Sequence, residues 1–337
     1  MDLNRKSFET EIAGRPLKIE VSRLAEQANA AVIATYGDTS ILATVVMGKE
    51  DKEGDFMPLV VDYEEKYYAV GKILGSQYVR REGRPSQNAI LSGRVIDRAI
   101  RPLFDNRIRR PIQITTTTIS YDEENDPDFV ALTAVSVALG ISDIPWSGPI
   151  AGLAVAKFGD KIVFNPTESE IREHESDCKF LSFVAGLDTQ VNMIEFEGYE
   201  VGEEEVISAY TEAMKEIDKI LAFEKNIISE IGKPKADVAL AEPSDELKSA
   251  VSEFLSGHLA EALFKKDKVE RDDSLASLKK DLFVSLEEKG FTEGDLPVVE
   301  RLLEAGIDEM VHKEALENDR RVDGRALSEV RELYAET

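Results

Sequence analysis

Apolar and polar residues alternate along most of the first 164 positions, which is the period of half-buried β-strands. Two hairpins are predicted first, one turning at Ala13-Gly14-Arg15 and one at Gly37-Asp38-Thr39. Single strands are predicted within residues 55–68 and 109–121. Two further hairpins are predicted over residues 149–164 and 178–198.

The period changes to that of a helix over residues 85–104, "PSQNAILSGRVIDRAIRPLF". Its apolar side carries Val95, Ile96, Ala99 and Ile100. Its opposite side carries Arg94, Arg98 and Arg101. Pro102 ends the helix, because the residue before a proline is driven out of the α region. The pattern therefore predicts an amphipathic helix with one basic face.

Three other regions have helical patterns. Residues 126–143 predict a buried helix that begins near Asp126 or Asp128. Residues 202–232 predict a long helix with an acidic first turn. From residue 244 to about 318 only helical segments are predicted, over 244–264, 274–290 and 296–316. The expected fold class is an α+β core of mixed sheets with packed helices, followed by a small all-α domain.

Composition narrows the class of protein. The chain is 42% hydrophobic and 32% charged, and it has no run of the roughly 20 apolar residues that a membrane span needs. The N-terminus lacks the apolar stretch of a signal peptide. The single cysteine, Cys178, excludes an internal disulfide and is interpreted as a packed small side chain. A reducing cytoplasm is the expected location, without a membrane partner.

Charge is distributed unevenly along the chain. The formal net charge is −25, which argues against general affinity for nucleic acid. Residues 76–110, however, contain nine arginines and only three acidic residues. The arginines are at positions 80, 81, 84, 94, 98, 101, 107, 109 and 110. This segregation predicts one local site for a polyanion. The alternative is that these arginines pair with the abundant carboxylates.

Residues 55–104, with "GSQYVRREGRPSQ" and the basic helix at their centre, resemble the first ribonuclease PH-like core of the bacterial polynucleotide phosphorylase family. The helical segment resembles that family's linker domain, and "RRVDGRALSEVREL" resembles the opening of its second core. The resemblance implies a core of the ribosomal protein S5 domain 2-like type. It also implies three parts: a first core over 1–235, a linker domain over 236–318 and the start of a second core over 319–337.

The family resemblance implies a function as well. Such a protein is a phosphorolytic 3′-to-5′ exoribonuclease and polyribonucleotide nucleotidyltransferase that acts in mRNA degradation. Inorganic phosphate is its co-substrate, Mg²⁺ assists, and the reaction is reversible. The resemblance implies a ring-shaped homotrimer around single-stranded RNA, with other RNA-degradation enzymes as possible partners.

Particular residues match the family's motifs. Arg80, Arg81 and Arg84 match the channel constriction that grips RNA, together with Tyr78. The family usually has an aromatic pair there, whereas this chain reads Tyr78-Val79, so weaker base stacking is expected. The three arginines of the basic helix match positions that face the cleft of the second core and complete its active site. Guanidiniums suit this role because they bind phosphate oxygens in pairs without reading sequence. For Arg101 the alternative is an ion pair with Asp97, four residues earlier.

The family's catalytic signatures are not found in the 337 residues. Where a serine-rich phosphate turn is expected, the chain reads "DEENDPD", residues 122–128, which would repel phosphate. Lys179, Leu181 and Phe183 occupy the positions expected for the two metal-binding carboxylates and the lysine of "GDxDxK". No catalytic or metal-binding residue is therefore assigned, and the chain alone is predicted to be inactive, with Mg²⁺ bound by a second core. The alternative is a free-standing, non-catalytic RNA-binding or scaffold subunit of an RNA-degrading ring complex.

Overall fold

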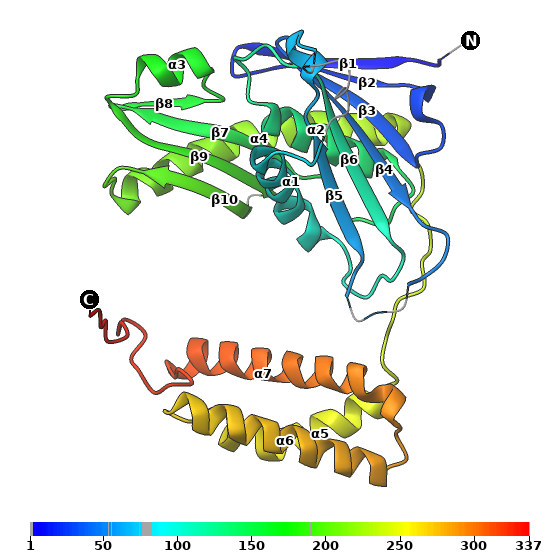
Figure 1. Cartoon of the computed structure of the whole chain (residues 1–337), viewed down its shortest axis with the longest axis vertical. Coiled ribbons are helices and arrows are strands. Elements are labelled where there is room, and N and C mark those ends of the chain that lie inside the picture. The colour runs from blue at the N-terminus through cyan, green and yellow to red at the C-terminus, as the bar shows by residue number, and fades with distance from the viewer. Residues whose placement is uncertain are drawn as a thin grey trace. The chain divides into compact units, whose positions relative to one another are not determined.

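The computed structural model describes residues 3–52, 54, 56–73, 75, 83–188 and 190–336. Among the described residues, the contacts divide the chain into two compact units, residues 1–240 and 241–337. The first unit contains two sheets with packed helices, and the second contains helices (Figure 1). This agrees with the predicted α+β core followed by an all-α part. No helix in the described part of the chain is long and apolar enough to cross a membrane.

The larger sheet of the first unit has six strands in the order β1-β2-β3-β4-β6-β5. The strands are β1 (Lys6–Ile12), β2 (Arg15–Val21), β3 (Ala30–Tyr36), β4 (Thr39–Met47), β5 (Leu59–Glu64) and β6 (Ile112–Ser120). Both predicted hairpins are confirmed: Ile12 pairs with Arg15, and Tyr36 pairs with Thr39. Gly37 has φ +59 in the second turn, and a Cβ there would lie 2.3 Å from Asn125 Nδ2. This turn therefore requires glycine.

The smaller sheet has four strands in the order β10-β9-β7-β8. They are β7 (Ala151–Phe158), β8 (Lys161–Phe164), β9 (Cys178–Leu187) and β10 (Gln190–Gly198). The β7-β8 and β9-β10 hairpins are the two that the sequence predicts, and both are antiparallel. A short helix, α3 (Glu168–Glu173), follows β8 and was not predicted. Its reciprocal capping hydrogen bonds join Thr167 and Glu170.

The longer helices of the first unit bury their apolar sides against the sheets. They are α1 (Gln87–Ile100), α2 (Pro127–Ile141) and α4 (Glu203–Ile231). The α1 helix packs on β5, α2 packs on β3, β4 and β7, and α4 packs on β7 and β9. The side chains of α2 are buried from Phe129 to Ile141, as predicted. The side chain of Ile228 in α4 packs directly against the backbone of Gly140 in α2, where a Cβ would lie 2.3 Å from Ile228 Cδ1.

Short 3₁₀ helices connect several of these elements. They are η1 (Arg23–Ala25), η2 (Tyr67–Val70) and η3 (Arg101–Leu103). The η3 turn follows α1 directly, with Pro102 in its first turn, which confirms the predicted end of α1. The backbone N–H of Tyr121, just after β6, donates to the carbonyl of Ala69 in η2 at 2.9 Å. This bond holds the end of β6 beside η2.

The segment after α4 is fastened to the first unit by hydrogen bonds. Lys235 Nζ donates to the carbonyls of Leu139 (2.7 Å), Gly140 (3.1 Å) and Ser142 (2.9 Å) at the end of α2. The backbone N–H of Ala236 donates to the carbonyl of Asp143 at 2.7 Å. The ammonium thus supplies donors to carbonyls at the end of α2, of which that of Leu139 also accepts from the Ser142 hydroxyl at 2.8 Å.

The second unit contains α5 (Asp245–Leu263), α6 (Lys268–Glu288), η4 (Glu293–Asp295) and α7 (Leu296–Asn318). Leucines from all three α-helices form its core. The α6 helix begins six residues before the predicted segment, because Asp267 caps it by accepting from the N–H groups of Val269 and Glu270. Residues after α7 form no helix or strand up to residue 336.

Candidate functional site

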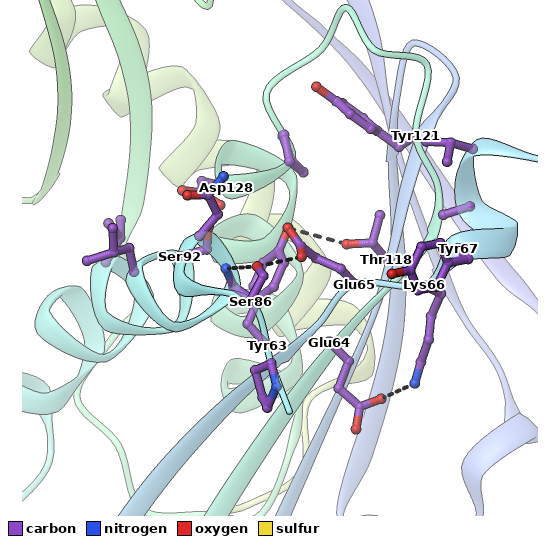
Figure 2. Close-up of a pocket in the computed structure, with 18 of the residues that line it drawn as sticks. Tyr63, Glu64, Glu65, Lys66, Tyr67, Ser86, Ser92, Thr118, Tyr121 and Asp128 are labelled. Atoms are coloured by element: carbon purple, nitrogen blue, oxygen red, sulfur yellow. Dashed lines mark hydrogen bonds and ion pairs between the residues drawn. The ribbon is translucent and has the colours of Figure 1, made fainter. Parts of the chain in front are cut away.

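A pocket of about 990 Å³ lies beside the N-terminal half of α1 (Figure 2). Its walls come from the end of β5, from η2, from the start of α1 and from the connection between β6 and α2. The lining includes Glu65, Tyr67, Arg84, Tyr121 and Asp128. The pocket therefore combines aromatic rings, carboxylates and a guanidinium.

Ser86 organises the side of the pocket formed by α1. It is the N-cap of that helix, and its hydroxyl oxygen accepts a hydrogen bond from the N–H of Ala89 at 2.9 Å. The same hydroxyl donates to Glu65 Oε2 at 2.7 Å (Figure 2). This bond fixes one oxygen of an exposed glutamate. Nearby, the Thr118 hydroxyl donates to the buried Tyr63 hydroxyl at 3.3 Å.

Two aspartates line the pocket at the start of α2. Asp126 is the N-cap, and its Oδ1 accepts from the N–H of Asp128 at 2.9 Å. Burial, with the negative charge of Asp128, raises the pKa of Asp126 to about 7. Burial also raises the pKa of Asp128, while a hydrogen bond from Ser92 acts in the opposite direction. This helix N-terminus presents carboxyl groups, which compete with phosphate for the same donors.

Asp122 and Glu124, from the same acidic segment, have structural contacts. Asp122 accepts hydrogen bonds from the N–H groups of Glu124 (2.9 Å) and Asn125 (2.7 Å) and from the Thr39 hydroxyl (2.9 Å). These bonds outweigh its burial and lower its pKa to about 2. Glu124 accepts from the hydroxyl and the N–H of Ser169. Their charges therefore hold the turn before α2.

The three arginines of the basic helix all lie on its exposed side, as predicted, but their surroundings differ. Arg98 donates to Glu195 and, at 3.0 Å, to the carbonyl of Ile194 in β10. Arg101 donates to both oxygens of Asp97, at 2.6 and 2.9 Å, and to the carbonyl of Leu59 at 3.1 Å. The ion-pair alternative therefore holds for Arg101 in this structure.

Arg84 and Arg94 are exposed, and neither has an ion pair or hydrogen bond with another described residue. Arg84 lines the large pocket, and Arg94 lines a smaller one of about 250 Å³ beside Asp97 and Arg101. The other predicted RNA contacts, Tyr78, Arg80 and Arg81, lie outside the described residues.

The remaining arginines of the cluster stabilise loops through ion pairs and hydrogen bonds. Arg107 pairs with Asp105 at 2.6 Å, and these hydrogen bonds lower the pKa of Asp105 to about 2. Arg109 is buried and donates to the carbonyls of Gly54, Asn106 and Ile108. Arg110 pairs with Asp51 at 3.4 Å. These contacts support the alternative interpretation for this part of the cluster.

The β9 strand does not have the side chains of the family's metal-binding motif. Lys179 in β9 pairs with Glu205 at 3.2 Å and with Asp160 at 3.6 Å. Leu181 and Phe183 are apolar, and Phe183 is buried. Among the described residues, no group of three or more histidine, cysteine, aspartate or glutamate side chains is placed to hold a metal ion. These residues do not fit the Mg²⁺ that the family resemblance implies.

Several lining residues were missed by the sequence analysis. Tyr67 and Glu65 stood within a segment assigned to a strand, whereas β5 ends at Glu64 and Tyr67 begins η2. Tyr121 was assigned only to the end of a strand. The one signal in the sequence was the cluster of three tyrosines in residues 63–68. This cluster precedes residues 75–87, which contain Arg80, Arg81 and Arg84 and are called the arginine loop below.

Comparisons with known proteins cover nearly all of the chain. The "3' exoribonuclease family, domain 1" matches residues 13–145, and "Polyribonucleotide nucleotidyltransferase, RNA binding domain" matches residues 246–326. Polyribonucleotide nucleotidyltransferase of Syntrophomonas wolfei is 42% identical over 336 residues, with 98% of this chain and 46% of that protein covered. The same-named protein of Caldicellulosiruptor bescii is 41% identical over 335 residues, with 99% and 47% covered.

The crystal structure of rice Rrp46 has a TM-score of 0.49 and 12% identity, with 67% of this chain and 95% of that chain covered. The chain spans about half the length of the curated relatives it matches, which are covered to 46% and 47%. The match over residues 13–145 confirms the predicted ribonuclease PH-like core. Since the similarity to proteins of one name extends over 98% or more of the sequence, the chain belongs to the polyribonucleotide nucleotidyltransferase family.

Proposed function

We propose that this chain is the RNA-gripping part of a phosphorolytic 3′-to-5′ exoribonuclease and polyribonucleotide nucleotidyltransferase that acts in mRNA degradation. Its arginine loop holds single-stranded RNA, and its core builds a homotrimeric ring in the cytoplasm. Inorganic phosphate attacks the terminal linkage of the RNA and releases a nucleoside diphosphate. Relatives that carry this enzyme name are similar over nearly the whole chain, which favours an enzyme part over a free-standing scaffold subunit.

In this proposal, the phosphate and Mg²⁺ sites lie outside these 337 residues. Two local features support this. At the start of α2 the N–H of Asp128 is already bound to the Asp126 carboxyl group, and β9 carries Lys179 bound to Glu205 instead of a metal-binding carboxylate. Mg²⁺ would stabilise the charge that develops on the transferred phosphoryl group, and the side chains at the start of α2 and on β9 take no part in that step. Arg94, Arg98 and Arg101 are assigned from the family resemblance to the cleft of the second core, where they would complete its active site.

The observation that supports the RNA-gripping role most directly is the exposed environment of the Arg84 side chain. Its side chain is exposed, lines a pocket and has no partner among the described residues, unlike Arg101 and Arg107 in the same cluster. An unpaired guanidinium can exchange its hydration for two phosphate oxygens without first breaking an ion pair. Arg80 and Arg81 are assigned to the same role from the sequence.

The salt dependence of RNA binding tests this assignment. Each phosphate contact of a single strand contributes a slope of about −0.7 to log K against log salt. Changing Arg80, Arg81 and Arg84 together to alanine should therefore reduce the slope for an oligoadenylate by about 2, measured by fluorescence anisotropy. The matched control is Arg107→Ala, which removes a charge already paired with Asp105 and should leave the slope nearly unchanged. An unchanged slope in the triple variant would mean that the arginine loop does not contact the RNA phosphates.

A further inference from the structure

We propose that the 990 Å³ pocket binds the base of a nucleotide and selects bases that carry an amino group. This inference rests on the proposed RNA-binding function and adds a second, base-reading contact next to the arginine loop. The volume is at the upper end of the range for small-ligand pockets, about 300 to 1,000 Å³, and is ample for one nucleotide. Three features of the lining support the assignment.

The first feature is a pair of tyrosines. Tyr67 and Tyr121 lie on the side of the pocket opposite Ser86 and Ser92 of α1 (Figure 2). Tyr67 is 48% exposed, so its ring is available to a ligand. The hydrogen bond from the N–H of Tyr121 to the carbonyl of Ala69 fixes the two tyrosine-bearing segments side by side. Aromatic rings of this kind stack on bases of single-stranded nucleic acids.

The second feature is the excess of hydrogen-bond acceptors. Glu65 projects into the pocket, with Oε2 held by Ser86 and Oε1 without a hydrogen bond to any other described residue (Figure 2). Asp126 and Asp128 add further carboxyl groups to the lining. A carboxylate accepts well from the amino groups of adenine, cytosine and guanine. Uracil offers one N–H between two carbonyl oxygens, which a carboxylate repels.

The third feature is the position of Arg84. Its guanidinium belongs to the same lining as Glu65 and Tyr67, and it has no partner among the described residues. A base held by the carboxylate therefore has a cation within the same pocket for its phosphate. An amino-bearing base and a phosphate together define a nucleotide. The bound nucleotide is either part of the RNA strand or a free nucleotide.

Binding measurements on the 337-residue protein test the proposal. Labelled A12 and U12 RNA are titrated by anisotropy, and ADP and UDP are titrated by calorimetry. We expect A12 to bind about tenfold more tightly than U12, because one well-placed base contact discriminates by about that factor. The isosteric Glu65→Gln should bring the A12 to U12 ratio close to one, since an amide can also donate to uracil. The matched control is Glu212→Gln, an exposed residue of α4 outside the pocket.

The stacking contact has its own pair of variants. Tyr67→Ala should weaken A12 binding about tenfold, whereas Tyr67→Phe keeps the ring and should preserve binding. Tyr68→Ala is the control, because Tyr68 is 57% exposed but does not line the pocket. Binding of ADP that depends on Glu65 and Tyr67 identifies a free nucleotide as the ligand. The same dependence for A12 alone identifies the RNA strand.

Two negative results have different meanings. If A12 binds with the arginine-dependent salt slope but neither Glu65→Gln nor Tyr67→Ala changes its affinity or base preference, the pocket proposal is wrong and the proposed function stands. If A12 and U12 do not bind at all, the proposed function fails. Equal thermal unfolding midpoints of the variants and the parent protein establish that the changes are local.

Discussion

Glu224 is fully buried on α4, and it provides a sharp test of the packing between α2 and α4. Its Oε2 accepts a hydrogen bond from the Ser136 hydroxyl at 2.7 Å, and the Ser136 oxygen in turn accepts from the N–H of Ile150 at 3.1 Å. Oε1 is buried and has no partner among the described residues. Burial raises the pKa of Glu224 well above its usual value, so the folded protein favours the neutral acid.

The sign of the pH dependence follows from that shift. An unfolded glutamate loses its proton near pH 4.3, whereas the folded protein must either keep the proton or bury a charge. The contribution of Glu224 to the free energy of unfolding is fully present below about pH 4.3, and it is lost as the pH rises toward the pKa of this group in the folded protein. One proton is involved, so the loss is at most about 1.4 kcal/mol per pH unit. Glu224→Gln removes this term and should stabilise the protein at neutral pH relative to the parent.

Urea unfolding followed by tryptophan fluorescence measures this difference. Trp146 is the single tryptophan of the sequence and is buried in the first unit, so its emission reports on the unit that contains Glu224. The free energy of unfolding of the variant minus that of the parent should rise from pH 4.5 to pH 7. Glu212→Gln, on the exposed side of the same helix, should show no such rise. A difference that is constant with pH would mean that Glu224 is ionised in the folded protein, and the reasoning would fail.

Two other predictions concern the C-terminal end of α2 and the catalytic activity of the 337-residue protein. Lys235→Met removes one donor from the carbonyls of Leu139, Gly140 and Ser142, of which Leu139 still accepts from the Ser142 hydroxyl. It should lower the free energy of unfolding by about 1 to 2 kcal/mol in the same urea assay, and an unchanged midpoint would show that water replaces the ammonium. The 337-residue protein with Mg²⁺, inorganic phosphate and poly(A) should release no nucleoside diphosphate above background, measured by chromatography. Release that a Leu181 substitution abolishes would place an active site on β9.

The hairpins of the fold were predictable because each is encoded within about 20 residues. Turn residues such as Ala13-Gly14 and Gly37-Asp38 stand between alternating strands, and local sequence suffices to pair them. The parallel pairing of β5 with β6 depends instead on the connection through α1, and no local pattern specifies it. The α3 helix has only six residues, too few to show a helical period. The first six residues of α6 were missed because the apolar stripe of this helix begins only at Leu275.

The candidate site was predictable only in part, for a related reason. Helical spacing placed Arg94 and Arg98 correctly on the exposed side of α1. Which of the two is available for a ligand depends on Glu195, almost a hundred residues later in the sequence, because the pairing of β9 with β10 brings that carboxylate beside Arg98. Sequence proximity does not reveal such a contact.

Ion pairs between residues far apart in the sequence also change what the number of arginines in residues 76–110 implies about binding. Within residues 76–110 the nine arginines exceed the acidic residues by six, but Glu195 and Asp51 come from other elements to neutralise Arg98 and Arg110. A paired arginine contributes little to the attraction of a polyanion, because binding phosphate would first require its ion pair to break. Among the described arginines of this segment, Arg84 and Arg94, which line the two pockets beside α1, are therefore the ones that the proposed RNA binding would use most readily. This pairing pattern, more than the net local charge, is the reason why the nucleotide proposal centres on the pocket that Arg84 lines.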